Sequence, residues 1–186
     1  RKFFRMLGPS DIRKVQELML PQSDKNFNDY LNLFTYRYPE NILYESVIDD
    51  LTRFIHGDEN VLTGSIIHDE NVRTALQSFL NEFLESLKLI EKLKNYKFNF
   101  SDCSIMNCIY AGAFLASGRN IEHAASYIGK LFNLEGSVLP TSIEDKILMA
   151  LRENGEMLYS EAEIVELRSN VRIDRIYLLD RSLEKE

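Results

Sequence analysis

The chain has 186 residues, of which 45% are hydrophobic and 27% are charged, and its formal net charge is −7. A chain of this length can bury a core of its own, and the acidic balance argues against non-specific binding to nucleic acid or to an anionic membrane. No apolar run reaches the roughly 18–20 residues that cross a bilayer, and no signal-peptide pattern opens the chain. We therefore expect a cytoplasmic protein with neither a nucleic-acid nor a membrane partner.

The first predicted helix lies near residues 10–20. Apolar residues recur there at helical spacing, at Ile12, Val15, Leu18 and Met19. Ser10 or Asp11 is a suitable N-cap. A cap and a solvated charge are the simpler explanation of Asp11 and Arg13. The alternative is that Arg13 reaches an anionic ligand held near this helix N-terminus.

A helical subdomain is predicted over residues 22–97, with helices near 27–38, 44–55 and 70–96. Pro39 ends the first of these helices and Asp69 is a reasonable N-cap for the third. Their apolar stripes are explained by a structural core, and the alternative is a surface for a partner protein. His56 and His68 are predicted to be surface imidazoles, because neither has metal-ligand or catalytic partners nearby.

The next predicted helix begins around Ser104 and continues into a run of small and apolar residues. The free backbone N–H groups of a helix N-terminus, together with Ser104 and Asn107, are suited to hold a phosphate. The alternative is that this terminus holds only its own cap. Cys103 and Cys108 are five residues apart, a spacing that makes a disulfide awkward and a zinc site poor, and a reducing compartment is expected.

After a further helix capped by Asn120, the sequence reads Gly136-Ser137-Val138-Leu139-Pro140-Thr141-Ser142. Pro140 cannot donate to a sheet ladder, so this stretch indicates a buried strand that ends there and opens into a loop. Thr141 and Ser142 would then present donors at the carboxyl end of a strand, where open α/β sheets bind ligands. A strand–loop junction with no ligand is the other interpretation.

The last part of the chain is predicted to be rich in strands. Segments 146–151, 156–166 and 173–179 have strand patterns, and Asn154-Gly155 indicates a two-residue hairpin turn. Glu161 and Glu163 would share one strand face while Glu166 points the other way. A solvated edge is therefore favoured over a metal cluster, and no metal ligand is assigned.

Five short motifs occur in an order and spacing that point to a known family. They are Asp11-Ile12-Arg13, Ser104-Ile105-Met106-Asn107 followed by Ala111-Gly112, the stretch from Gly136 to Ser142, Ser160-Glu161-Ala162-Glu163-Ile164, and Ile173-Asp174-Arg175-Ile176. In these motifs the chain resembles the 2-phospho-L-lactate transferase (CofD-like) family. The likeness is greatest to the bacterial branch that includes the gluconeogenesis-factor proteins called YvcK.

The resemblance implies an α/β protein with a Rossmann-like core that carries a helical insertion. The segments would be 1–21, a helix preceding the insertion, 22–97, the helical subdomain, and 98–186, an α/β segment with a β-hairpin. The transferase branch moves a phospholactyl-type group from a guanosine diphosphate carrier to a deazaflavin alcohol and uses a divalent metal such as Mg. The YvcK branch is regulatory and binds nucleotide-sugar or dinucleotide ligands.

Both branches imply a nucleotide-type ligand. Whether the protein forms a homo-oligomer is not predicted. The residues expected to hold the ligand phosphate are Asp11, Arg13, Ser104, Asn107, Pro140, Thr141 and Ser142. No general base is named, so any transfer would depend on positioning and electrostatic stabilisation.

The chain also departs from the family pattern. Met106 stands where the family has Gly, which adds bulk where backbone would approach a phosphate, and Cys103 stands where bacterial members often have His. The family's glycine-rich loops, the expected phosphate cradle, are not found, and the first residue is Arg. We expect a central part of a longer protein or a degenerate member. A non-catalytic sensor whose pocket Met106 has closed is the alternative to a transferase.

Overall fold

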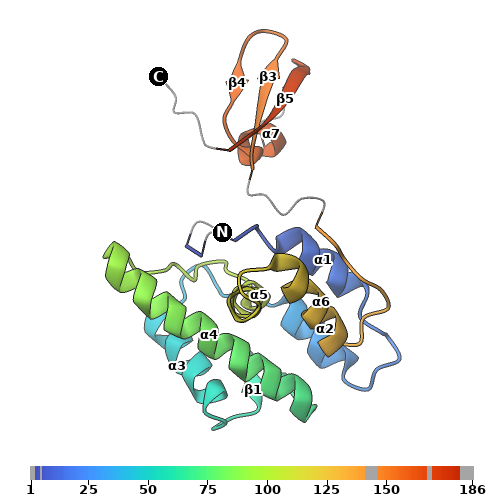
Figure 1. Cartoon of the computed structure of the whole chain (residues 1–186), viewed down its shortest axis with the longest axis vertical. Coiled ribbons are helices and arrows are strands. Elements are labelled where there is room, and N and C mark those ends of the chain that lie inside the picture. The colour runs from blue at the N-terminus through green and yellow to red at the C-terminus, as the bar shows by residue number, and fades with distance from the viewer. Residues whose placement is uncertain (1–2, 5, 141–145, 167–168, 181–186) are drawn as a thin grey trace. The chain divides into compact units, whose positions relative to one another are not determined.

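A computed structural model of the chain describes residues 3–4, 6–140, 146–166 and 169–180. The chain divides into two compact units, Arg1–Ile143 and Glu144–Glu186. The described residues of the first unit form six helices and a short hairpin, and those of the second form a three-stranded sheet and one helix (Figure 1). The structure is thus a mixture of helices and small sheets, consistent with an α/β protein. These units differ from the predicted segments 1–21, 22–97 and 98–186, which remain a prediction about the family fold.

The six predicted helices of the first unit are confirmed. They are α1 (Ser10–Leu18), α2 (Phe27–Thr35), α3 (Tyr44–Ile55), α4 (Glu70–Lys94), α5 (Ile105–Ala116) and α6 (Ile121–Leu131). A hairpin of β1 (Val61–Leu62) and β2 (Ser65–Ile66), which the sequence did not predict, connects α3 to α4.

Two of the three predicted N-caps are confirmed. The Asp69 side chain accepts hydrogen bonds from the backbone N–H groups of Asn71 and Val72, and Asn120 accepts one from His123. The cap predicted for α1 is wrong, because Pro9 occupies the N-cap position and no side chain caps this helix. Ser10 and Asp11 instead lie inside the first turn, with both side chains exposed.

The second helix ends three residues earlier than predicted. Tyr36 leaves the helical conformation, with φ −62° and ψ 135°. Beyond it, Arg37 forms a β-bridge with Ser104, and the Tyr38 backbone N–H donates to the Cys103 carbonyl at 2.9 Å. Pairing with a segment 65 residues away in sequence therefore replaces the last turn of the predicted helix.

Helix α5 lies at the centre of the first unit, where Figure 1 shows it almost end-on between α4 and α6. Nine of its residues are buried, from Ile105 to Phe114. At Gly112 an added Cβ would lie 1.8 Å from the Phe79 carbonyl oxygen of α4. The small-residue run of the sequence thus allows two helix backbones to approach closely.

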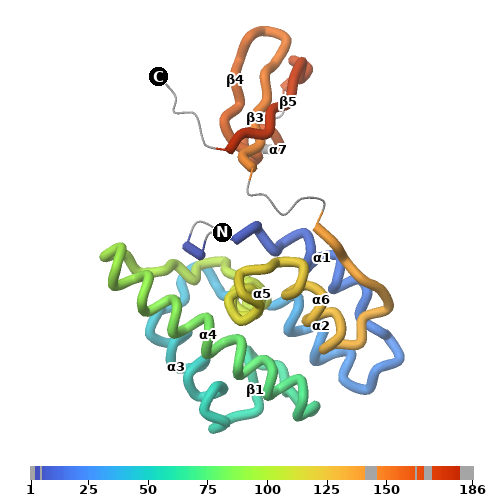
Figure 2. The backbone as a smooth tube through the Cα atoms, in the orientation of Figure 1, coloured from blue at the N-terminus to red at the C-terminus, as the bar shows by residue number. Residues whose placement is uncertain are grey.

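The strand predicted at the end of the Gly136 stretch is wrong. Residues 136–140 form no strand, and Leu139 is 70% exposed. The segment instead runs beside the end of α1, where the Glu135 N–H donates to the Met19 carbonyl at 3.0 Å (Figure 2, orange beside blue). Without a neighbouring strand its apolar pair cannot be buried in a sheet. Thr141 and Ser142 lie outside the described residues.

The second unit contains an antiparallel sheet in the order β4-β3-β5, formed by Met157–Leu158, Ile147–Arg152 and Ile173–Leu179. The hairpin predicted at Asn154-Gly155 is confirmed and joins β3 to β4, but its turn is not the two-residue turn predicted. The Gly155 N–H donates to the Arg152 carbonyl at 2.9 Å, so Glu153 and Asn154 are the central residues of the turn, and Gly155 follows them with a φ of +86°. The other two predicted strands are present as β3 and β5.

The long strand predicted over 156–166 is wrong. Only Met157 and Leu158 pair with β3, and Glu161–Glu166 is a helix, α7. The Ser160 hydroxyl accepts from the Glu163 N–H at 3.2 Å, and the Glu163 carboxylate accepts from the Tyr159 N–H at 2.7 Å. These contacts resemble the capping box that starts helices with the pattern Ser-x-x-Glu. The strand faces assigned to Glu161, Glu163 and Glu166 therefore do not exist.

Candidate functional site at the N-terminus of helix α5

Two polar atoms at the start of α5 have no hydrogen-bond partner among the described residues. Ser104 is the N-cap residue and is fully buried, yet its hydroxyl makes no cap bond. The Asn107 Oδ1 is likewise buried and unpartnered. Ser104 and Asn107 occupy the two positions of a capping box, in which such side chains normally bond the helix backbone. A buried polar group without a partner costs about 1–3 kcal/mol, so these atoms are candidates for binding a ligand.

The segment after α2 forms the wall of this site. The Arg37 guanidinium donates two hydrogen bonds to the Asp102 carboxylate, at 2.6 and 3.0 Å, and these bonds hold the pKa of Asp102 below its usual range. Tyr38 is buried, and its hydroxyl has no partner among the described residues. Burial raises the pKa of Tyr38 far above its ordinary value, so the phenol stays protonated.

Two thiols complete the surroundings of this helix start. The Sγ atoms of Cys103 and Cys108 are 3.9 Å apart, and both cysteines are free. We call Tyr38, Cys103, Ser104, Asn107 and Cys108 the α5 N-terminal cluster. It combines a helix N-terminus with hydroxyl, amide and thiol groups, and it contains no carboxylate or imidazole. Such a set of groups can bind and orient an anion.

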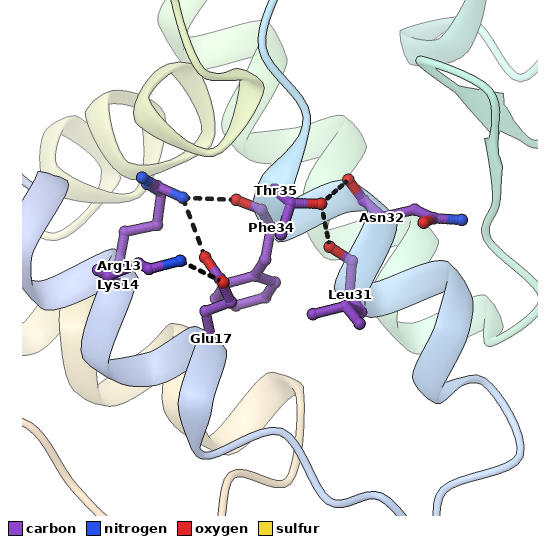
Figure 3. A network of polar contacts seen from close by, with 7 residues as sticks. All are labelled: Arg13, Lys14, Glu17, Leu31, Asn32, Phe34 and Thr35. Atoms are coloured by element: carbon purple, nitrogen blue, oxygen red, sulfur yellow. Dashed lines mark hydrogen bonds and ion pairs between the residues drawn. The ribbon is translucent and has the colours of Figure 1, made fainter.

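Arg13, predicted as a charge clamp, is buried and bonded within the protein (Figure 3). Its Nη1 donates to the Phe34 carbonyl at 2.6 Å and to the Glu17 carboxylate at 3.4 Å, while Lys14 also donates to Glu17, at 2.6 Å. The Arg13 Nε has no partner among the described residues. Asp11 is exposed and lies away from these contacts on the first turn of α1.

Arg13 nevertheless lies close to α5. Burial raises the pKa of the Tyr110 hydroxyl, and the positive charge of Arg13 partly opposes that rise. Tyr110 follows Asn107 by three residues, so the two side chains are neighbours on one helix face. Arg13 thus lies near the middle of α5, and its hydrogen bonds among the described residues go to Phe34 and Glu17 rather than to Ser104 or Asn107.

The Gly136 stretch lines a separate hollow of about 510 Å³. Its walls come from α1, α6 and the segment after α6: Gln16, Ala125, Ser126, Gly129, Lys130, Asn133, Leu134, Gly136, Ser137 and Val138. Gln16 connects this hollow to α5, because its Nε2 donates to the Ala125 carbonyl at 2.9 Å and its Oε1 accepts from the Tyr110 hydroxyl.

The predicted meeting of Asn107 and Thr141 around one anion stays a prediction, since Thr141 and Ser142 are outside the described residues. Pro140, the last described residue of the stretch, is partly exposed and is not part of the hollow. Tyr38 and Arg37 are the site residues that sequence reasoning missed. No local pattern marks them, because they reach α5 through pairing between distant segments.

A divalent metal, which the family implies, has no set of ligands in the described part of the chain. No group of three or more His, Cys, Asp or Glu side chains is placed there to hold a metal ion. His56 and His123 are exposed, and His68 lies 3.9 Å from the Asp29 carboxylate, away from the cluster. The residues described do not fit a metal, and we derive no step through one.

The described residues form helices and small sheets, which is consistent with an α/β protein. The chain belongs to the family described as 2-phospho-L-lactate transferase CofD, whose family model matches residues 1–184. This membership indicates a phospholactate-transfer-like function. Neither a curated protein nor a solved structure matches the chain significantly. None of the helices described here has the length and apolar character needed to span a membrane.

Proposed function

We propose that the chain binds a nucleotide diphosphate or nucleotide-sugar ligand in a Rossmann-like CofD fold, with a ligand phosphate at the α5 N-terminal cluster. The observation that carries this proposal is the buried, unpartnered hydroxyl of Ser104 at the N-cap of a twelve-residue helix. Backbone N–H groups and the helix dipole favour a phosphate at such a terminus, and the Ser104 hydroxyl and the Asn107 amide nitrogen are side-chain donors. The same proposal assigns phosphate binding to five further residues, which are Asp11, Arg13, Pro140, Thr141 and Ser142.

In the transferase form of this proposal, the ligand is the carrier of a phospho(lactyl)-type group. The cluster holds the diphosphate and stabilises the negative charge that develops during transfer. A binding role without catalysis, as in the YvcK branch, is the second candidate. It is favoured because Asp102, the carboxylate beside the α5 N-terminal cluster, is paired with Arg37 and has a lowered pKa, which makes it a poor base.

The position of Met106 is relevant to both candidates. Its side chain is fully buried and belongs to the hydrophobic core of the first unit. The Met106 side chain, which stands where the family has glycine, is therefore accommodated in the core. This supports the proposal that the N-terminus of α5 can still bind a ligand.

Isothermal titration calorimetry with GDP, a UDP-sugar and NAD tests the binding proposal. At least one ligand should bind the wild-type chain, and Ser104→Ala should weaken that binding about tenfold, the equivalent of one charge-assisted hydrogen bond. The melting temperature should not fall, because the hydroxyl has no partner to lose. Ser117→Ala, at the other end of the same helix, is the matched control and should bind as the wild type does.

The absence of binding by all three ligands to a folded chain would overturn the proposal. If binding is found, incubation with a phospholactyl-guanosine diphosphate carrier and a deazaflavin alcohol separates the two candidates. Release of nucleotide that depends on the acceptor supports the transferase, and tight binding without release supports the sensor.

A further inference from the structure

The spacing of Cys103 and Cys108 in the sequence argued against a disulfide, but the structure places the two thiols close enough to react with one another. They occupy the positions before the N-cap and four residues into α5, whose side chains commonly touch across the start of a helix. Their Sγ atoms are already 3.9 Å apart, and a disulfide requires about 2.0 Å. Cys108 lies within α5, whereas Cys103 precedes the helix and its thiol donates to the Ser104 carbonyl at 3.6 Å. Rotation of the Cys103 side chain away from this carbonyl would bring the two sulfur atoms together.

The two thiols differ in exposure and in ionisation. Cys103 is partly exposed, whereas Cys108 is 1% exposed. The hydrogen bond with Cys108 lowers the pKa of Cys103, burial opposes this change, and the positive charge of Arg37 adds to it. The same hydrogen bond, together with burial, raises the pKa of Cys108. Because the thiolate is the nucleophile, Cys103 is the attacking residue and Cys108 the second, resolving one.

We propose that Cys103 and Cys108 are a redox-active pair that a small hydroperoxide converts to an intramolecular disulfide. First, the Cys103 thiolate attacks one peroxide oxygen, the O–O bond breaks, and the leaving oxygen takes a proton to become an alcohol or water. This step leaves Cys103 as a sulfenic acid. The Cys108 sulfur then attacks the Cys103 sulfur, and the displaced hydroxide leaves as water with the Cys108 proton. The two thiols lose two electrons and the peroxide gains them.

The full chain allows a direct test, since it contains only these two cysteines. After treatment with hydrogen peroxide, titration should find both thiols lost, and the intact mass should fall by two hydrogens. Reduction with dithiothreitol should restore both. A disulfide between two chains only, or a stable sulfenic acid in the wild type, would overturn the proposal.

Single variants assign the two roles. Cys108→Ser should stop at a sulfenic acid on Cys103 that dimedone captures. Cys103→Ser should react with peroxide about tenfold more slowly than the wild type, because the remaining thiol is buried and protonated. Equal rates for the two variants would contradict the assignment of Cys103 as the attacking thiol.

Arg37→Gln tests the contribution of the nearby charge to the reactivity of Cys103. It should slow peroxide oxidation severalfold at neutral pH. The matched control is Arg53→Gln, because Arg53 also pairs with an exposed carboxylate, that of Glu59, but lies at the end of α3. If both variants oxidise at the wild-type rate, Arg37 has no part in activating Cys103.

Discussion

At the scale of single residues, the ion pair of Arg37 and Asp102 connects the segment after α2 to the segment before α5. Arg37 follows α2 and Asp102 precedes α5, so their two hydrogen bonds hold together segments that the sequence keeps far apart. Asp102 also has a positive φ of 53°, which an Asp side chain tolerates better than most. Both side chains are exposed, so water screens their attraction and the contribution to stability is small.

The pKa of Asp102 predicts how this contribution changes with pH. Its pKa is lowered in the folded state, so the stabilisation is present above the ordinary value of about 4 and is lost as pH falls through the lowered folded value. The difference in urea midpoint between wild type and Asp102→Asn should be constant above about pH 5 and should shrink below about pH 4. Asp49→Asn, on the exposed face of α3, is the control. A difference that persists at low pH would contradict the prediction.

Gly112 is a residue at which the backbones of α4 and α5 approach closely. A Cβ there would meet the backbone of Phe79, at 1.8 Å from its oxygen and 2.5 Å from its carbonyl carbon, so one helix must move. We expect Gly112→Ala to lower the free energy of unfolding by about 1–3 kcal/mol, measured by urea denaturation. Gly8→Ala, with no atom within 4 Å of the added Cβ, should change it little. Equal stability of both variants would mean that the close approach does not occur.

At the scale of elements, sequence patterns predicted some helix N-termini correctly and others wrongly. Asp69 and Asn120 were predicted as N-caps and act as caps, because a short acceptor before an apolar stripe has a local role. The pattern Ser160-x-x-Glu163 is equally local, yet it lies in the segment predicted to be the partner strand of the hairpin at Asn154-Gly155. The cap of α1 failed for a different reason: the chain enters that helix through Pro9, whose carbonyl accepts from the Arg13 N–H.

The cap of α4 provides a test at this scale. Asp69→Ala removes the acceptor for two backbone N–H groups of the longest helix, so the free energy of unfolding should fall by about 1 kcal/mol. Asp49→Ala in the middle of α3 should be neutral or slightly stabilising, because Ala is the better helix former. Thermal denaturation followed by far-ultraviolet circular dichroism measures both. A neutral Asp69→Ala would indicate that water replaces the cap at no cost.

At the scale of the whole molecule, the two units differ in how much apolar surface they bury. The hydrophobic core extends from Phe4 to Phe132 within the first unit. In the described part of the second unit, only Met149, Ala150 and Leu158 are buried hydrophobic residues. A three-stranded sheet with so small a core is marginal by itself.

This difference predicts the result of dividing the chain. Residues 1–140 should retain a cooperative thermal transition, with a melting temperature within about 5 °C of that of the full chain. Residues 144–186 alone should show no cooperative transition. Circular dichroism of the two fragments and the full chain provides the comparison. Loss of the transition from the first fragment would show that its core depends on the second unit.

The sequence by itself determined the elements whose signals are local. Apolar spacing predicted the six helices of the first unit, and the Asn154-Gly155 pair predicted the hairpin. Motif order predicted the family to which the chain belongs. These features depend on neighbours within a few residues or on short motifs, so a single amino-acid sequence is enough to find them.

Only the tertiary structure decided what surrounds α5. Arg37 and Tyr38 reach its N-terminus through pairing across 65 residues, and that pairing also shortens α2. Arg13 donates to the carbonyl of Phe34, which lies 21 residues further along the chain. Leu139 is exposed because no strand lies beside it. Burial and the loss of a hydrogen-bond partner depend on which distant groups come together, and that information is not contained in the spacing of residues along the chain.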